Sequence, residues 1–380
     1  MSDKTHIQWT DATWNPVTGC SIVSAGCTNC YAMRLAGTRL KNIPSREGLT
    51  KEVNGNHVWT GEIRFNIQAL DEPLRWAKPR MIFVCAHGDL FHEGVSDEVI
   101  DQVFAVIARS PRHTFQILTK RESRMHDYIR SIEELSLSNP ELMKHRWAAA
   151  AGNLGPNHQA PVEVTWPLPN VWLGVSVEDQ KSADQRISVL LNTPAAVRWI
   201  SAEPLLGPID LTKLPLHGRE TYDALAQADQ ARYSHAESHR LDWVVLGGES
   251  GPEARLMHYK WEETIRLQCE AAGVPYFRKQ WGEWKPISAM LEDEHVRLYR
   301  SNKRAAPHQD QAAIDESYGR TCTVDACIMH ADGKRFDDPA APMAFNSDGG
   351  FPMTMFKVGK KAAGSTLNGI EHQAWPEAAA

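Results

Sequence analysis

The chain alternates short apolar runs with segments of helical periodicity, and this alternation restricts its fold more than any other feature. Each run is nearly continuous in apolar residues, as expected for a strand that is covered on both faces of a sheet. Strands that alternate with helices predict a parallel sheet with right-handed crossover connections. The predicted strands are Met81–Ala86, Phe115–Thr119, Val171–Val177, Val197–Ala202, Trp243–Leu246 and Pro275–Gln280.

We therefore expect an α/β protein built as a partial (βα)6-like barrel of the TIM type, with insertions and a C-terminal extension. The barrel is expected to occupy residues 1–285, with insertions at about 136–169 and 214–239, and the extension residues 286–380. At 380 residues, of which 42% are hydrophobic, the chain is long enough for one large α/β domain or two ordinary ones.

Two of the helices carry recognisable end signals. After Val171–Val177, Ser182 and Gln185 have the spacing of a capping box, which predicts a helix start there. Further along, Trp261, Ile265 and Cys269 fall on one face of a helix that is expected to stop at Gly273, a residue typical of the position after a helix.

The charge balance and hydropathy restrict the class of protein. Forty-one Lys and Arg against 47 Asp and Glu give a net charge of −6, which argues against a protein that holds nucleic acid mainly by bulk positive charge. A local basic patch remains possible. The chain has no run of eighteen apolar residues and no signal-peptide segment at its start, so we expect no membrane association and a cytoplasmic protein.

Charged side chains gather just after the predicted strands. In a barrel or an open α/β sheet, the carboxyl ends of the strands are where the active site is built, so these side chains are candidates for a common site. They are Asp89, Lys120, Glu178, Glu203 and Glu249.

Three of the seven cysteines, Cys20, Cys27 and Cys30, lie within eleven residues of one another on a glycine-containing loop. Neighbouring thiolates repel one another unless a cation neutralises them, so a metal centre is a physical reason to bring them together. Three alternatives stay open: an iron–sulfur cluster, a structural zinc site and unligated thiols. An iron–sulfur cubane normally takes four cysteines, so three leave one iron open for a ligand.

Zinc requires a closed shell of four ligands, so it would need a distant partner such as His87, His92 or the pair Cys322 and Cys327. The spacing of Cys322, Cys327 and His330 would also permit a second metal site.

Several motifs along the chain resemble those of the phage- and prophage-associated three-Cys-motif family, which is related to radical S-adenosylmethionine (radical SAM) enzymes. The resemblance covers the chain from Ile7 to about Trp284, together with residues 358–364. The motifs are Trp9-Thr-Asp-Ala-Thr-Trp-Asn-Pro-Val-Thr-Gly-Cys20, Asp89-Leu-Phe-His92, Leu173-Gly-Val-Ser-Val-Glu178, Ser201-Ala-Glu-Pro204, Gly247-Gly-Glu-Ser250 and Lys279-Gln-Trp-Gly282.

The resemblance implies that Cys20, Cys27 and Cys30 ligate a [4Fe–4S] cluster whose open iron binds S-adenosylmethionine. One electron would cleave the sulfonium to methionine and a 5′-deoxyadenosyl radical, which abstracts a substrate hydrogen. The spacing departs from the superfamily pattern, because six and two residues intervene between the cysteines here instead of three and two. Such an enzyme needs an electron donor such as a flavodoxin or ferredoxin.

The remaining candidates are assigned to the cofactor. Ser176 and Glu178 would hold its carboxylate or ribose, and Lys120 would balance the anionic cluster or bind a phosphate-bearing substrate. A Gly-Gly-Glu motif of the superfamily accepts from the methionine ammonium, and both Gly247-Gly248-Glu249 and, by strand order, Asp89 are candidates for that role. Glu203, at a strand exit, is expected to point into the barrel mouth.

The substrate is expected to be a small molecule or a nucleic acid, with a nucleobase suggested by the phage association and by Arg34, Arg39, Lys41, Arg46 and Lys51 after the cysteines. One alternative is a non-enzymatic, zinc-stabilised protein that binds nucleic acid or another protein, and another is a hydrolase that uses His and carboxylates at the strand ends without a metal. In the first two readings the tryptophans Trp9, Trp14, Trp281 and Trp284 are candidates for stacking on a base.

Overall fold

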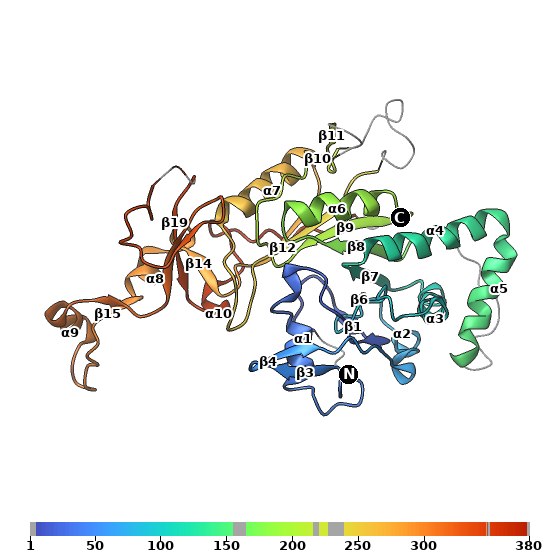
Figure 1. The fold of residues 1–380 in the computed structure, drawn as a ribbon, viewed down its shortest axis with the longest axis horizontal. Coiled ribbons are helices and arrows are strands. Elements are labelled where there is room, and N and C mark those ends of the chain that lie inside the picture. Colours follow the sequence, from blue (N-terminus) through green and yellow to red (C-terminus); the bar gives the residue numbers. More distant parts are fainter. Residues whose placement is uncertain are drawn as a thin grey trace.

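The computed structural model describes residues 5–154, 165–215, 220–226, 239–346, 348 and 350–377. Its central element is a seven-stranded sheet in which all neighbouring strands are parallel and the spatial order follows the chain. The sheet is curled like half of a barrel (Figure 1). Its strands are β1 (Ala12–Trp14), β6 (Met81–Val84), β7 (Thr114–Thr119), β8 (Val171–Ser176), β9 (Val197–Ala202), β12 (Trp243–Gly247) and β13 (Tyr276–Gln280).

These observations confirm a mixed α/β fold with a partly closed parallel sheet. The six predicted strands agree with the structure to within a few residues, because each was a continuous apolar run. β8, β9 and β12 are buried along their whole lengths, as strands covered on both faces should be.

Helices cover the outer face of the sheet, and the large apolar core lies between the two layers (Figure 1). The helices of this part of the chain are α1 (Tyr31–Gly37), α2 (Glu72–Arg75), α3 (Asp97–Ala108), α4 (Glu122–Ser138), α5 (Pro140–Ala150), α6 (Gln180–Leu191) and α7 (Tyr259–Ala272). α7 buries Trp261, Ile265 and Cys269 and is followed by Gly273 at φ 63°, as predicted.

The predicted capping box is wrong in position. α6 begins at Gln180, and its N-cap is Asp179, whose carboxylate accepts from the backbone N–H of Ser182 at 2.8 Å. Ser182 is therefore the third helical residue of a different capping box, in which its hydroxyl accepts from the backbone N–H of Asp179 at 3.0 Å. The misplacement arose because both Ser and Asp are favoured N-cap residues and lie three positions apart.

The inner face of the curled sheet is filled by aromatic side chains. Trp172, Trp199 and Trp243 come from β8, β9 and β12, and Trp9 of the N-terminal segment packs edge-on against Trp199 with ring centroids 5.2 Å apart. Gly174 makes room for this layer, because a Cβ at that position would lie 2.5 Å from the Trp199 ring. The interior below the strand ends is thus solid, as in barrels whose lumen is packed with side chains.

The two predicted insertions differ in character. Within the first, α5 packs beside α3 and α4 and buries Met143 and Trp147, while residues 155–164 lie outside the described residues. Within the second, β10 (Leu214–Pro215) and β11 (Thr221–Tyr222) form a small antiparallel pair. Residues 216–219 and 227–238 of that segment lie outside the described residues.

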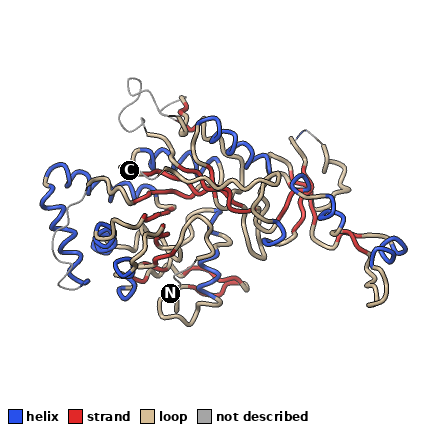
Figure 2. Tube along the Cα trace, turned by 180° about the vertical axis from the view of Figure 1, so that it is seen from behind, coloured by secondary structure: helices blue, strands red, loops and turns tan. Residues whose placement is uncertain are grey.

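The C-terminal region contains a second, antiparallel sheet in the order β14-β19-β17-β18. An arm that carries β15 and α9 projects from it at the end of the molecule opposite α5 (Figures 1 and 2). The elements are β14 (Trp284–Pro286), α8 (Glu292–Val296), β15 (Tyr299–Arg300), α9 (Gln311–Tyr318), β16 (Thr321–Cys322), β17 (Ala326–Met329), β18 (Arg335–Phe336), β19 (Met353–Lys357) and α10 (Lys360–Ala363).

The outer edge of β13 is covered by the end of the chain. The backbone N–H of Arg278 donates to the carbonyl of His372 at 2.7 Å, and that of Ala374 donates to the carbonyl of Tyr276 at 3.2 Å. The Trp243 indole N–H donates to the carbonyl of Ala374 at 2.8 Å. This tail supplies partners for backbone groups that an edge strand otherwise leaves open.

Two short pairs accompany the N-terminal part, β2 (Val17–Thr18) with β5 (Arg64–Phe65) and β3 (Thr50–Val53) with β4 (Asn56–Trp59). No helix among the described residues is long and apolar enough to cross a lipid bilayer.

Candidate functional site

A cavity of about 490 Å³ opens at the carboxyl ends of the parallel strands and is lined by all three clustered cysteines. Most of the site residues predicted from the sequence also line it, as expected where strand ends of a parallel sheet converge. They are Cys20, Cys27, Cys30, Asp89, Lys120, Ser176, Glu203, Gly248 and Glu249. Glu178 and Gly247 lie directly behind this lining, in contact with Gly26 and Glu203 respectively.

The cysteine loop has a defined shape that its glycines make possible. Gly19 has a φ of 95°, and a Cβ there would lie 2.1 Å from the carbonyl oxygen of Glu62, so only glycine fits. A 3₁₀ turn (Ala25–Cys27) carries Cys27, and Cys30 is the N-cap of α1. The three thiols therefore reach one cavity from three different points of the loop.

The thiols sit in unequal electrostatic surroundings. Burial and the charge of Asp89 raise the pKa of Cys20 to about 12, although the Arg121 guanidinium lies 3.6 Å from its sulfur and acts in the opposite direction. Burial also raises the pKa of Cys30. For Cys27 burial is overcome by the charge of Lys120 and by backbone hydrogen bonds, so its pKa is lowered. Cys27 is thus the thiol held most readily as a thiolate, the form that binds metals.

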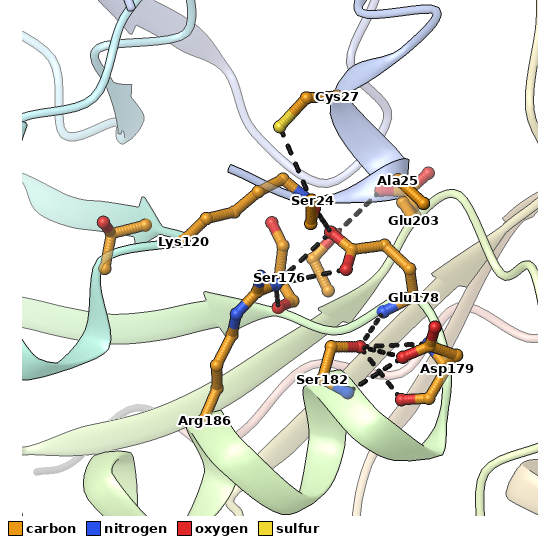
Figure 3. A network of polar contacts seen from close by, with 12 residues as sticks. Ser24, Ala25, Cys27, Lys120, Ser176, Glu178, Asp179, Ser182, Arg186 and Glu203 are labelled. Carbon is orange, nitrogen blue, oxygen red and sulfur yellow. Dashed lines mark hydrogen bonds and ion pairs between the residues drawn. The ribbon is translucent and has the colours of Figure 1, made fainter. Parts of the chain in front are cut away.

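Glu178 is the centre of a buried polar network beneath the loop (Figure 3). Its carboxylate accepts from the Ser24 hydroxyl at 3.2 Å, from the Arg186 guanidinium at 3.2 Å and from the Lys120 ammonium. The Ser24 hydroxyl also lies 3.8 Å from the Cys27 sulfur. Burial lowers the pKa of Lys120 to about 8, although the negative charge of Cys27 acts to raise it. The network joins the loop to the ends of β7 and β8.

Asp89 is fully occupied by donors from the chain itself. One carboxylate oxygen accepts from the Thr119 hydroxyl at 2.7 Å and from the Phe91 backbone N–H at 3.0 Å. The other accepts from Arg121 at 3.0 Å and from the Lys120 backbone N–H at 3.3 Å. Arg121 also donates to the Ser21 hydroxyl at 2.7 Å, so this cluster fixes the first part of the cysteine loop.

Glu249 anchors the other side of the same loop. Its carboxylate makes a two-point ion pair with Arg255, at 2.6 and 2.9 Å, and accepts from the side chain of Asn29 at 3.0 Å. Arg255 in turn donates to the carbonyl of Ala25 at 2.9 Å. Asn29 stands between two of the cysteines, so the segment after β12 holds the loop in place. Arg186 and Arg255 carried no sequence signal, because their carboxylate partners lie 8 and 6 residues away across loop segments, a spacing that marks no regular element.

Glu203 is the lining carboxylate with the fewest donors. It pairs with Lys279 of β13 at 2.9 Å and accepts from the Ser201 hydroxyl at 3.3 Å. Its side chain retains 14% of its exposure within the cavity. Gly247 and Gly248 are close-approach glycines, since a Cβ at Gly248 would lie 1.9 Å from the Trp281 carbonyl oxygen.

The other sequence candidates have mainly structural contacts. His92 accepts from or donates to the Ser21 hydroxyl at 2.9 Å, and the His87 ring packs against Tyr31. Trp14, Trp281 and Trp284 are buried with their indole N–H groups bonded to backbone carbonyls, and among the four tryptophan candidates only Trp9 lines the cavity.

Cys322 and Cys327 lie on β16 and β17, and His330 bonds the Ala344 carbonyl at 2.8 Å. Over the described ranges, no three His, Cys, Asp or Glu side chains converge closely enough to ligate a single ion.

The fold and the cavity define an α/β protein with a three-cysteine pocket at the carboxyl ends of a curled parallel sheet. The chain belongs to the family described as "Protein of unknown function (DUF5131)", whose profile matches residues 4–376. Neither the curated proteins nor the solved structures contain a significant match to the chain.

Proposed function

We propose that the protein is a radical SAM enzyme in which Cys20, Cys27 and Cys30 hold a [4Fe–4S] cluster and the adjoining cavity holds S-adenosylmethionine. The observation that carries this proposal is that three thiols of one loop line a single cavity at the carboxyl ends of a parallel sheet. We further infer that the curled sheet is a variant of the TIM-type (βα)6 partial barrel, extended by one strand.

The donor set fits an anionic iron–sulfur cluster. A cluster spreads its cysteine ligands over several iron atoms, so its thiols need not converge on one point as those of a single ion do. Arg121 beside Cys20 and Lys120 beside Cys27 place positive charge next to two of the three sulfurs. Such cations offset the negative charge of a thiolate-ligated cluster.

When bound, the cluster supplies the electron that cleaves the sulfonium of S-adenosylmethionine. The chain's own residues position and shield the reactants. Glu203, Ser176 and Ser201 line the cavity with acceptor and hydroxyl groups for the polar ends of the sulfonium nucleoside. The tryptophan layer below excludes water from that end of the cavity.

The carboxylates whose oxygens are already hydrogen-bonded within the chain have a different role from Glu203. Asp89, Glu178 and Glu249 each have their oxygens occupied by several donors of the chain, so we assign them to positioning the loop. Glu203 is left as the carboxylate for a ligand ammonium. In the cell, a flavodoxin or ferredoxin would deliver the electron.

The test is anaerobic reconstitution of the purified chain with iron and sulfide, followed by an assay for 5′-deoxyadenosine from S-adenosylmethionine with and without dithionite. We expect close to four irons per chain and dithionite-dependent product, both lost in Cys27→Ala. Cys322→Ala is the matched control, since this half-buried thiol lies outside the cavity.

Absence of product from the wild type, or equal yield from Cys27→Ala, overturns the proposal. One equivalent of zinc that survives reconstitution would favour the zinc-stabilised binding protein instead.

A further inference from the structure

Three further cations, Arg34, Lys279 and Lys360, line the cavity. They come from α1, from β13 and from α10, three elements that are distant in the sequence. Lys360 belongs to the lysine-rich segment Lys357-Val-Gly-Lys-Lys361, which nothing in the function above uses. Only the tertiary structure brings Lys360 to the cavity, since no sequence pattern predicts it.

The cations beside the cysteines and the other three cations of the cavity differ in their pairing. Lys120 and Arg121, next to the cysteines, each have a carboxylate partner, Glu178 and Asp89. Among the other three, Lys279 is paired with Glu203. Arg34 and Lys360 have no carboxylate within ion-pair distance among the residues that the structure describes.

The position of Arg34 depends on a neighbouring glycine, Gly251. Gly251 has a φ of 120°, and a Cβ there would lie 2.3 Å from a terminal guanidinium nitrogen of Arg34. The backbone N–H groups of Gly251 and Lys360 both donate to Glu283, at 2.9 and 3.2 Å. The Arg34 guanidinium, beside Gly251, and the backbone of Lys360 therefore lie near opposite oxygens of the Glu283 carboxylate. That carboxylate accepts hydrogen bonds from backbone N–H groups.

Lys279 and Lys360 are close enough to repel each other. Burial lowers the pKa of Lys360, and the charge of Lys279 lowers it further, while Glu203 and Glu283 oppose the change. Three cations against Glu203 and Glu283 leave an excess of positive charge around these side chains. Like charges gathered in this way are stabilised by an anion that binds between them.

We propose that Arg34, Lys279 and Lys360 form a subsite for the phosphate group of a small phosphorylated substrate. This inference rests on the proposed function, because it places that substrate in the same cavity as the sulfonium nucleoside. A planar guanidinium beside two ammonium groups provides the charge-assisted donors that phosphate oxygens accept.

A small phosphate ester suits the surroundings better than a polynucleotide. The three cations line one cavity of about 490 Å³, in which Arg34 and Lys360 remain exposed to solvent, and the whole chain carries a net charge of −6. Arg39, Lys41 and Lys51, which would extend a basic surface from Arg34, do not line the cavity. An extended nucleic acid would need such a continuous basic track.

The test is calorimetric titration of the full-length chain, as purified and after reconstitution, with inorganic phosphate, cytidine 5′-monophosphate and cytidine. We expect the nucleotide to bind at least about 10-fold more tightly than the nucleoside, and inorganic phosphate to compete with it. Lys360→Met and Arg34→Met should each weaken nucleotide binding about 10-fold and leave cytidine binding unchanged, since each removes one charged donor. Lys361→Met is the matched control, an exposed neighbour outside the cavity lining.

Three outcomes would overturn the inference: no binding of phosphate or nucleotide at millimolar concentration, equal binding of nucleotide and nucleoside, or no effect of both substitutions together. Tighter binding of a single-stranded oligonucleotide that depends on Arg39, Lys41 and Lys51 would assign the surface to a polynucleotide instead. Binding is measured without turnover, so the two proposals are tested separately. Loss of phosphate binding with 5′-deoxyadenosine still formed would refute only the phosphate subsite. Phosphate binding without 5′-deoxyadenosine would refute only the radical SAM chemistry.

Discussion

Gly26 shows how one missing side chain sets the position of the cysteine loop. It is buried next to Cys27, and a Cβ there would lie 2.5 Å from Cγ of Glu178. Glu178 is itself 2% exposed and held by Arg186, Ser24 and Lys120, so it has no room to retreat. The carboxylate network and the loop therefore pack as one unit.

We predict that Gly26→Ala displaces this unit. The clash should lower the free energy of unfolding by about 1–3 kcal/mol, the usual cost of overpacking, and should reduce iron incorporation on reconstitution. Urea unfolding and iron analysis measure the two effects. Ala25→Ser, at the exposed neighbouring position, should change stability by less than about 0.5 kcal/mol. A Gly26→Ala protein as stable as the wild type would show that the loop is not fixed by Glu178.

His87 makes the stability dependent on pH. Burial, together with the charges of Arg46 and Arg39, lowers its pKa from 6.5 to about 4. The unfolded chain therefore binds more protons than the folded one between these values, so the stability from neutral His87 is complete above pH 6.5. It is lost as the pH falls toward 4, by up to about 3 kcal/mol.

His87→Phe keeps a ring against Tyr31 and removes the titration. We predict a shallower loss of unfolding free energy from pH 6.5 to 4 in this variant, with the exposed His308→Phe unchanged relative to the wild type. Urea titrations at half-unit pH steps provide the measurement. If the unfolding free energy falls equally steeply with pH in the wild type and in His87→Phe, the pH dependence does not come from His87, whatever the contribution of the other histidines.

At the residue scale, the sequence predicted which side chains gather at the site but not which groups they bond. Asp89 and Glu249 were expected to bind a cofactor ammonium, yet both are occupied by donors of the chain. Their partners Arg121 and Arg255 are 32 and 6 residues away, and neither pairing follows from spacing along the chain. Pairing of this kind depends on loop geometry, which a strand–helix pattern does not encode.

At the scale of elements, the continuous apolar runs predicted the parallel strands well, since a strand buried on both faces has an unmistakable composition. The C-terminal antiparallel sheet was missed. Its strands are two to five residues long, and β18 is half exposed, so its sequence lacks both a long apolar run and a clear alternation. β1, with three residues, was equally hard to delimit.

The tail on β13 leads to a prediction at this scale. Truncation after Glu371 removes three hydrogen bonds to the sheet, each worth about 1 kcal/mol, and leaves the β13 edge open. We expect the unfolding free energy to fall by about 3 kcal/mol and the protein to self-associate through the open edge. Denaturant unfolding and light scattering report the two effects. Truncation after Glu377 is the control, and a monomeric, fully stable protein ending at Glu371 would refute the role of the tail.

At the scale of the whole molecule, stability should be unevenly distributed. β8, β9 and β12 are buried throughout, whereas in the arm α9 buries only Asp315 and β15 pairs with β16 through two residues. Segments with few buried contacts open locally without global unfolding. We predict that backbone amides of the three central strands exchange with deuterium at least about 100-fold more slowly than those of residues 299–322. Equal protection would mean that the arm folds together with the sheet.

The tether between Asn29 and Glu249 spans 220 positions of the chain, and Arg255 completes it. During synthesis on the ribosome, the cysteine segment emerges first, and its anchor is made 220 residues later. Until Glu249 and Arg255 have been synthesised, the cysteine loop therefore lacks the contacts that hold it in place. Any inorganic centre built on these sulfurs is accordingly expected to be delivered to the finished polypeptide rather than to the growing one.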